Sequence, residues 1–230
     1  KFFSKDIIIR SNSSSEGWSK NFLKNLLYKF FFKLPNQIIV NSFEFKKKLD
    51  VKFGVNSHVI YNPLNKNENK KMSKKKIKLK FFTGSFIKII TVGRLVDQKD
   101  HLTMLKAINL IKNRNIKLLI IGSGKNKIIL DNYIKSNNLL SKVKILPFKK
   151  NPYKYIALAD IFLFTSIYEG LPNVLLEAQC LKKYIISTDC PTGPKEILLN
   201  GKVGELVPIL DYREVSKKIV KYDKTKKNKK

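Results

Sequence analysis

Short apolar runs alternate with longer amphipathic stretches from residue 86 onward. The apolar runs predict strands at 87–92, 117–121, 143–146, 161–164, 184–187 and 204–207. The stretches between them predict helices at about 98–113, 125–137, 152–158, 173–182 and 211–221. Several runs are apolar throughout, which is typical of parallel strands covered on both faces. Six strands alternating with helices predict a doubly wound α/β sheet, whose ligands bind beyond the carboxyl ends of the strands.

The pattern before residue 64 is less regular. Residues 6–9 and 38–40 predict strands, and Asn41-Ser42 predicts the cap of a helix that runs to about Phe53. Residues 18–34 predict a further helix before Pro35, with apolar positions at Trp18, Phe22, Leu23, Leu26, Leu27, Phe30, Phe31 and Leu34. Lysines at its other positions also fit an amphipathic helix on a membrane surface. We expect the apolar stripe to pack on its own domain and keep the membrane surface as the alternative.

Residues 65–80 are polar and rich in lysine, so they predict a solvated linker or loop insertion. We therefore expect a domain boundary there. The predicted division is an N-terminal part at 1–64, a linker at 65–85, a sheet domain at 86–222 and a basic tail at 223–230. The sequence of the tail is typical of a frayed terminus or of a segment weakly attracted to anionic lipid headgroups.

The charge of the chain is strongly positive. Its 230 residues include 47 Lys and Arg against 17 Asp and Glu, a formal net charge of +30. Such a balance fits binding to nucleic acid or to an anionic membrane surface. Arginine, which nucleic-acid sites favour, occurs only at Arg10, Arg94, Arg114 and Arg213. The lysines, together with abundant Asn, Ile and Phe, favour compositional drift over selected charge, which argues against a nucleic-acid partner.

Cysteine content and hydropathy exclude several classes of protein. With only Cys180 and Cys190, a disulfide scaffold is excluded and a reducing compartment is expected. No apolar run approaches the roughly 20 residues of a membrane span, and no signal peptide is visible. We therefore expect a cytoplasmic protein.

Two of the turns that follow predicted strands carry residues suited to a phosphorylated ligand. Arg94 and Lys99 follow Gly93 at the opening of a helix, where two cations suit a diphosphate; the alternative is that both are surface charges. Gly122 begins a Gly-Ser-Gly turn after the second strand. This turn fits a phosphate contact and a tight strand-to-helix turn about equally, because it lacks the full dinucleotide or P-loop pattern.

A third turn precedes the helix predicted at 173–182. Pro172 and Asn173 open this helix, whose free amides and dipole form an anion site. Glu177 lies one turn into the helix, and Glu169 lies in the loop before it. Both carboxylates are suited to accept hydrogen bonds from sugar hydroxyls; the alternatives are a surface helix residue and a loop charge.

These segments, in this order and spacing, resemble the family 4 glycosyltransferases, which are retaining enzymes of the GT-B fold with nucleotide-sugar donors. The Glu169–Glu177 spacing is the family's Glu-x7-Glu motif. The resemblance also rests on the segments 93–95, 98–102, 121–124, 169–173, 189–196 and 201–208. Residues 36–63 look like the end of the family's N-terminal domain. We therefore expect a donor-binding Rossmann-like domain preceded by an incomplete second one, with the family's glycine-rich loop and its histidine outside this chain.

The resemblance implies a role for each matched residue. Arg94 and Lys99, beside Gly93, bind the donor diphosphate and stabilise the leaving nucleotide, and Glu169 contacts the transferred sugar; these three are the candidate catalytic residues. Donor binding is further implied for Gly122, for Phe148 near the base, for Gly170, Leu171, Pro172 and Asn173 around the phosphates, and for Glu177 on the ribose. No metal or other cofactor is expected, since His58 and His101 stand in no ligand cluster and no Asp-x-Asp occurs.

The function that follows is transfer of a hexose or N-acetylhexosamine from a UDP- or GDP-linked donor, with retention, to a glycan or polyprenyl-linked acceptor. The implied setting is bacterial surface polysaccharide or glycolipid synthesis on the inner face of the membrane. Two alternatives remain: a chain that binds nucleotide sugar without transferring it, and a basic nucleic-acid-binding protein.

Overall fold

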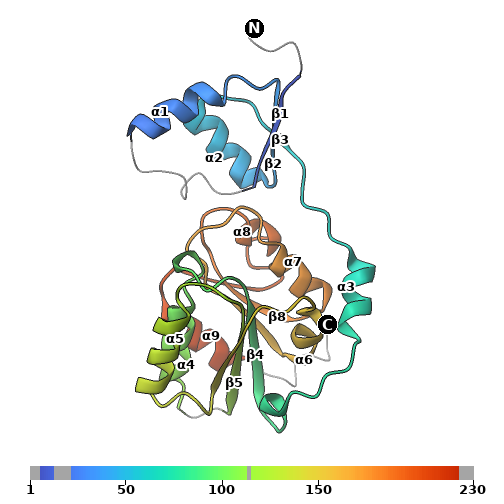
Figure 1. Cartoon of the computed structure of the whole chain (residues 1–230), viewed down its shortest axis with the longest axis vertical. Helices are drawn as coiled ribbons and strands as arrows, with labels where there is room; N and C mark the ends of the chain where they lie inside the picture. The colour runs from blue at the N-terminus through green and yellow to red at the C-terminus, as the bar shows by residue number, and fades with distance from the viewer. Residues whose placement is uncertain (1–5, 13–21, 113–114, 223–230) are drawn as a thin grey trace.

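The computed structural model describes residues 6–12, 22–112 and 115–222. Trp18 and the basic tail at 223–230, which the sequence analysis singled out, lie outside these residues. The described chain forms two parallel sheets, one of six strands and one of three (Figure 1). We call them, with their helices, the larger unit (residues 66–222) and the smaller unit (residues 6–62).

The larger sheet has the strand order β6-β5-β4-β7-β8-β9, and all its pairings are parallel. Its strands are β4 (Ile87–Val92), β5 (Ile116–Ile121), β6 (Val143–Leu146), β7 (Ile161–Phe164), β8 (Tyr184–Thr188) and β9 (Glu205–Val207). The predicted strands agree with these bounds to within one residue at each end. The strand order steps outward on both sides of β4 and β7, which confirms the doubly wound α/β prediction.

Successive side chains of each buried strand point to opposite faces of the larger sheet, so both faces are apolar. Helices cover both of them. Ile89 of β4 belongs to one apolar cluster and Ile90 to the other. The first cluster includes residues of α4 (His101–Leu110), α5 (Lys127–Ser136) and α9 (Tyr212–Lys221). The second includes residues of α6 (Tyr153–Leu158), α7 (Asn173–Cys180), α8 (Pro194–Ile197) and the 3-10 turn η2 (Lys80–Phe82).

The smaller sheet pairs β1 (Ile8–Ser11), β2 (Gln37–Val40) and β3 (His58–Val59) in parallel, in that order. Helix α2 (Phe43–Phe53) begins as predicted, with the Ser42 hydroxyl accepting from the Phe45 amide, and ends at Gly54 in the left-handed conformation. The core of this unit consists of Ile38, Val40, Phe45, Leu49 and Phe53. The structure thus contains a second, smaller unit of parallel strands and helices, as the sequence predicts.

The prediction that the first helix packs on its own domain is wrong for most of its apolar side chains. Helix α1 (Phe22–Phe31) contains no buried residue, and Phe22 is 78 % exposed. Tyr28 and the following Phe32 do contact the ring of Phe53. The other apolar residues of this face lie on the surface: Leu23, Leu26, Leu27, Phe30, Phe31 and Leu34. The periodicity identified the helix, but in the described part of the smaller unit the three strands and α2 leave its apolar face uncovered.

The prediction of a solvated linker at 65–80 is also wrong. Residues Lys66–Ser73 form helix α3, capped by the Asn65 side chain, which accepts from the Glu68 amide. Helix α3 packs against α6 and α7, and the Asn151 side chain donates to the Met72 carbonyl at 3.0 Å. Apolar residues that follow it join the second cluster: Ile77, Leu79, Phe81 and Phe82. The segment therefore belongs to the larger unit, although lysine dominates its composition.

Candidate functional site

The turns singled out in the sequence meet at the carboxyl edge of the larger sheet. The turns after β4 and β5 pack directly against each other, since the Gly93 amide donates to Ile121 and the Leu95 amide to Ser123. A Cβ atom on Gly122 would lie 1.8 Å from the Gly93 carbonyl oxygen, and one on Gly124 would lie 2.3 Å from that of Leu95. Both glycines are thus required by this close backbone approach, so the tight-turn interpretation of the Gly-Ser-Gly segment holds in the structure.

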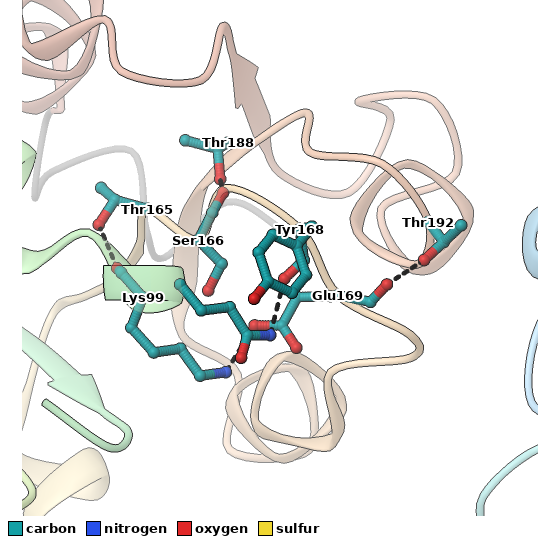
Figure 2. A network of polar contacts seen from close by, with 8 residues as sticks. Lys99, Thr165, Ser166, Tyr168, Glu169, Thr188 and Thr192 are labelled. Carbon is teal, nitrogen blue, oxygen red and sulfur yellow. Dashed lines mark hydrogen bonds and ion pairs between the residues drawn. The ribbon is translucent and has the colours of Figure 1, made fainter. Parts of the chain in front are cut away.

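Lys99 and Glu169 are brought together by the fold. Lys99 ends the 3-10 turn η3 (Asp97–Lys99), and its ammonium group lies 2.5 Å from the Glu169 carboxylate (Figure 2). Both side chains are largely buried, at 18 % and 10 % exposure. The ammonium group also lies over the Phe164 ring, 5.3 Å from its centre. A cation and a carboxylate thus share one shielded position beside the ends of β4 and β7, where their interaction is stronger than on the surface.

Hydrogen bonds to backbone carbonyls, most of them donated by side chains, fix the loops that carry this pair (Figure 2). The Gln98 amide group donates to the Tyr168 carbonyl at 2.8 Å, and the Ile167 amide donates back to Gln98. The Thr165 hydroxyl bonds the carbonyls of Lys99 and Asp100. These polar residues are not among the site residues predicted from the sequence. Their only signal was position: each lies at or just after the carboxyl end of a strand or in a matched motif.

The loop after β8 holds Glu169 from the other side. The Thr188 hydroxyl donates to the Ser166 carbonyl at 2.6 Å, and the Thr192 hydroxyl donates to the Glu169 carbonyl (Figure 2). The Glu169 amide in turn donates to the Pro191 carbonyl at 3.2 Å. Hydrogen bonds to the Glu169 amide and carbonyl therefore fix its backbone, and the ion pair with Lys99 holds its carboxylate.

Arg94 and Phe148 lie at the same edge but are not drawn into this network. Arg94 is exposed, and within the described ranges its guanidinium has no ion-pair partner at hydrogen-bonding distance. The Phe148 ring is 73 % exposed, while the Phe148 amide donates to the Ser123 hydroxyl at 3.2 Å. Arg94 is thus an exposed cation near the buried pair, and the backbone at Phe148 lies at the same edge of the sheet.

Glu177 lies one turn into α7 and is half-buried. The Tyr153 hydroxyl of α6 donates to its carboxylate at 3.3 Å. Burial raises the pKa of Glu177, and the hydrogen bond from Tyr153 partly opposes that shift. At the start of the same helix, Pro172 is the capping residue and Leu171 is buried in the second cluster.

Gly170 and Asn173 face the smaller unit. A Cβ atom on Gly170 would lie 2.1 Å from the Asn12 carbonyl oxygen, so this position admits only glycine. The Asn173 side chain accepts from the Asn62 side chain at 2.7 Å. Two residues of the predicted donor site therefore also hold the two units together, which the sequence did not indicate.

A groove with a volume of about 890 Å³ lies between the two units. One wall is α2, with Lys47 and Lys48, and the other is the loop after β8, with Pro191 and Thr192. Glu44 also lines it, and burial is the main cause that raises the pKa of its carboxyl, with the charges of Glu196 and Asp189 adding to the shift. Pro191 and Thr192 hydrogen-bond the backbone of Glu169, so this wall of the groove is joined directly to the loop that carries the Lys99–Glu169 pair.

Neither histidine stands among metal ligands. His101 is buried at the start of α4, and burial lowers its pKa to about 4, helped by the charge of Lys99. Over the described ranges, no three His, Cys, Asp or Glu side chains gather to hold a metal ion. Cys180 and Cys190 are both free thiols. Among the helices the structure describes, none is long and apolar enough to cross a membrane.

Comparison with known proteins identifies the family. The family described as "Glycosyl transferases group 1" matches residues 72–230. A glycosyltransferase of Methanocaldococcus jannaschii is 34 % identical over 181 residues, covering 75 % of this chain and 44 % of that protein. An N-acetylgalactosaminyltransferase of Campylobacter jejuni, named for a diphospho-undecaprenol acceptor, is 38 % identical over 121 residues, covering 53 % of this chain and 33 % of that protein. The chain thus spans less than half the length of these relatives.

The fold agrees with solved structures of the same architecture. Anabaena HepE, crystallised with UDP and glucose, superposes with a TM-score of 0.84 at 19 % identity, covering 97 % of this chain and 64 % of that chain. TarM superposes with a TM-score of 0.74 at 20 % identity, covering 94 % of this chain and 43 % of that chain. These neighbours have the GT-B fold that the sequence motifs implied. The chain therefore belongs to the group 1 glycosyl transferases, of the family 4 type.

Proposed function

We propose that this chain is the donor-binding part of a glycosyltransferase that moves a hexose or N-acetylhexosamine from a nucleotide sugar to a glycan or lipid-linked acceptor, with retention and without a metal ion. In this proposal residues 1–64 belong to the acceptor-side domain, and the donor-binding domain covers 86–222. The observation that carries the proposal is the shielded Lys99–Glu169 pair at the carboxyl edge of the larger sheet.

Lys99 is proposed to exchange partners when the donor binds. In the structure its ammonium group neutralises Glu169. A donor diphosphate beside Arg94 would take over the Lys99 charge and free the Glu169 carboxylate for hydroxyls of the transferred sugar. Negative charge grows on the diphosphate as the sugar–phosphate bond breaks, so fixed cations there stabilise the transition state. The amides of Gly170 and Leu171 at the start of α7 add to this stabilisation.

The other proposed donor contacts are arranged along the edge of the larger sheet in the order of its strands. Phe148 and Gly122 lie at the ends of β6 and β5, where the backbone would hold the base. Arg94 and Lys99 lie after β4, at the diphosphate, and Glu169 lies after β7, at the sugar. Glu177 would hold the ribose hydroxyls, with Tyr153 orienting its carboxylate. We favour UDP over GDP because solved structures of the same fold contain UDP.

The acceptor is proposed to enter through the groove between α2 and the loop after β8. The wall formed by Pro191 and Thr192 is hydrogen-bonded to the backbone of Glu169, so an acceptor there would approach the sugar held by that residue. A lipid-linked acceptor and a role in surface polysaccharide synthesis are supported by relatives named for a diphospho-undecaprenol acceptor and for capsular polysaccharide biosynthesis in Staphylococcus aureus.

We propose that the protein works at the cytoplasmic face of an anionic membrane. The exposed apolar face of α1, with lysines in the same helix, supports this location. Binding to vesicles that contain an anionic phospholipid, weakened in a Phe22→Ser/Leu26→Ser variant, is the expected result. Equal binding of that variant would contradict the role of α1.

Lys99→Ala tests the proposed function. Charge-assisted hydrogen bonds contribute roughly 1.5–3 kcal/mol, so the variant should bind UDP and transfer sugar about 10- to 100-fold less well. Lys125→Ala is the matched control, because Lys125 also pairs with a carboxylate at this edge, Asp97, but both side chains are exposed. Isothermal titration with UDP, GDP and their sugar conjugates gives the affinities. Unchanged UDP affinity and rate in Lys99→Ala would contradict the proposal.

Two competing functions have their own signatures. Nucleotide-sugar binding without any transfer, in an assay that offers lipid-linked sugars, would support a binding protein. Salt-sensitive binding to random DNA, without affinity for nucleotide sugars, would support a nucleic-acid-binding protein.

A further inference from the structure

The contact between the two units is built around one carboxylate, Glu196. Its Oε1 atom accepts from the Phe43 amide at 3.2 Å, and its Oε2 atom accepts from the Glu44 amide at 3.3 Å. The Tyr61 hydroxyl donates to Oε1 as well. Glu196 lies in α8 of the larger unit, whereas the three donors lie in the smaller unit. Figure 1 shows α8 at the end of the larger unit that faces the smaller one.

Glu196 differs from the carboxylates that pair with lysine, and also from Asp100 and Asp211, which accept from amides at the start of a helix in their own unit. Lysine is the partner of Asp50, Asp97, Asp131, Glu205 and Glu214. Glu196 instead binds the amides at the start of α2, which have no acceptor within the helix. A carboxylate there also meets the positive end of the helix dipole. Basic side chains are abundant in this chain, which has 47 Lys and Arg, yet the hydrogen bonds described for Glu196 come from two backbone amides and a hydroxyl.

The contact also reaches the candidate catalytic loop. Gly193 precedes Glu196 by three residues and has a φ of +91°, and a Cβ atom there would lie 2.3 Å from the Gly170 carbonyl oxygen. Thr192 and Pro191, which directly precede Gly193, hydrogen-bond the backbone of Glu169. The segment 191–196 therefore touches the Glu169 loop at one end and α2 at the other. A displacement of α2 at Glu196 would be transmitted to Glu169 across six residues.

We propose that Glu196 is a positioning residue, which sets the smaller unit in register with the loop that carries Glu169. The proposal rests on the proposed function, because it makes the alignment of acceptor groove and donor sugar depend on this carboxylate. Two further contacts across the interface, Asn62 to Asn173 and Asn12 against Gly170, are between neutral groups, and in a third the Gly193 backbone amide donates to the Glu44 carboxyl. Glu196 differs from these contacts because its carboxylate accepts from two successive amides at the start of α2.

Glu196→Gln tests the proposal with little change of volume. A glutamine has one acceptor oxygen and presents a donor group where the second amide requires an acceptor, so at least one of the Phe43 and Glu44 amides loses its partner. Glu205→Gln is the matched control. Glu205 also accepts from a tyrosine hydroxyl, that of Tyr184, at 2.8 Å, but within the larger unit.

Residual dipolar couplings of the whole chain report the relative orientation of the two units without a label. In the native chain and in Glu205→Gln, couplings from β2 and from β4 should fit one alignment tensor. In Glu196→Gln they should require two, and exchange of the Phe43 and Glu44 amides should rise roughly 10- to 100-fold. Glu196→Asp, which keeps the charge, should restore part of the native couplings.

The same variants separate positioning from stability and from the proposed function. In transfer assays Glu196→Gln should lower kcat while the donor KM stays within about twofold, since the donor contacts lie in the larger unit. A single tensor in Glu196→Gln, or an equal effect of Glu205→Gln, would overturn the positioning role. Failure of the native chain to bind UDP would instead overturn the proposed function, and the couplings would still decide the role of Glu196 at the interface.

Discussion

The two units of this protein follow the same sequence rules but differ in how completely those rules are satisfied. Both consist of parallel strands joined by helices. The larger sheet is covered on both faces by two extensive apolar clusters, whereas the described core of the smaller sheet consists of five buried apolar residues. Its first helix leaves Phe22 and Leu23 mostly exposed. An amphipathic pattern thus predicts an element wherever it occurs, but burial depends on how many neighbouring elements are present.

The difference implies unequal stability. The larger unit buries every residue of β7 and most residues of β4 and β5, and it is expected to fold as one cooperative body. The smaller unit gains contacts at the interface, chiefly through Glu196 and Asn62. We expect it to open more easily than the larger unit, in a local unfolding event that leaves the six-stranded sheet intact.

The largest expected effect comes from removing one buried ring in each unit. Phe162 of β7 and Phe45 of α2 are both fully buried, and Phe→Ala in a core costs about 3–5 kcal/mol. Phe162→Ala should lower the free energy of global unfolding by that amount. Phe45→Ala should open the smaller unit alone, because the larger core does not depend on it. Denaturant unfolding together with amide exchange measures both. Equal loss of protection in β4 for the two variants would show that the units unfold as one.

A smaller effect is expected from the buried histidine of the larger unit. The pKa of His101 is lowered to about 4, mainly by burial, so the unfolded chain binds a proton more readily between pH 4 and 6.5. This contribution to stability is complete above pH 6.5 and is lost as the pH falls toward 4, by up to roughly 3 kcal/mol. Unfolding midpoints measured across this range should show the loss, and His101→Gln should remove it. The same substitution at His58, which is exposed in β3, is the control; loss of the pH dependence there would contradict the assignment to His101.

The smallest expected effect compares a glycine from each unit. Gly54 ends α2 with a φ of +65°, and Gly201 of the larger unit has a φ of +87°; neither has an atom closer than 3.7 Å to an added Cβ. Each Gly→Ala change should therefore cost only the backbone strain, about 1 kcal/mol. Amide exchange should assign the loss to the smaller unit for Gly54 and to the larger unit for Gly201. A cost at Gly54 that spreads to β4 would contradict the independence of the two units.

The strands of the larger sheet were predictable because each is an apolar run between polar turns, and the run length sets the strand length. Helix α3 was not predictable from hydrophobic periodicity, because it packs against α6 and α7 and is bonded by the Asn151 side chain, all of which lie far along the sequence. The available signal was Asn65 three residues before Glu68, a helix-capping pattern within a lysine-rich segment.

The candidate site was predictable to the level of its turns. Arg94, Lys99, Glu169 and Glu177 could be singled out because ligands of such sheets bind beyond the strand ends. The pairing of Lys99 with Glu169 could not, since it depends on how the η3 turn and the loop after β7 fold toward each other. The role of Glu196 depends on a contact across more than 150 residues of sequence, which local patterns do not report.

The central claim is that a nucleoside diphosphate binds at the carboxyl edge of the larger sheet, and chemical-shift mapping with UDP tests it most directly. We predict saturable shifts at the amides of Lys99, Gly170 and Leu171 and around Glu177, with β1 and the exposed face of α1 unaffected. Shifts confined to lysine-rich surfaces, equal for UDP and inorganic phosphate, would contradict the account.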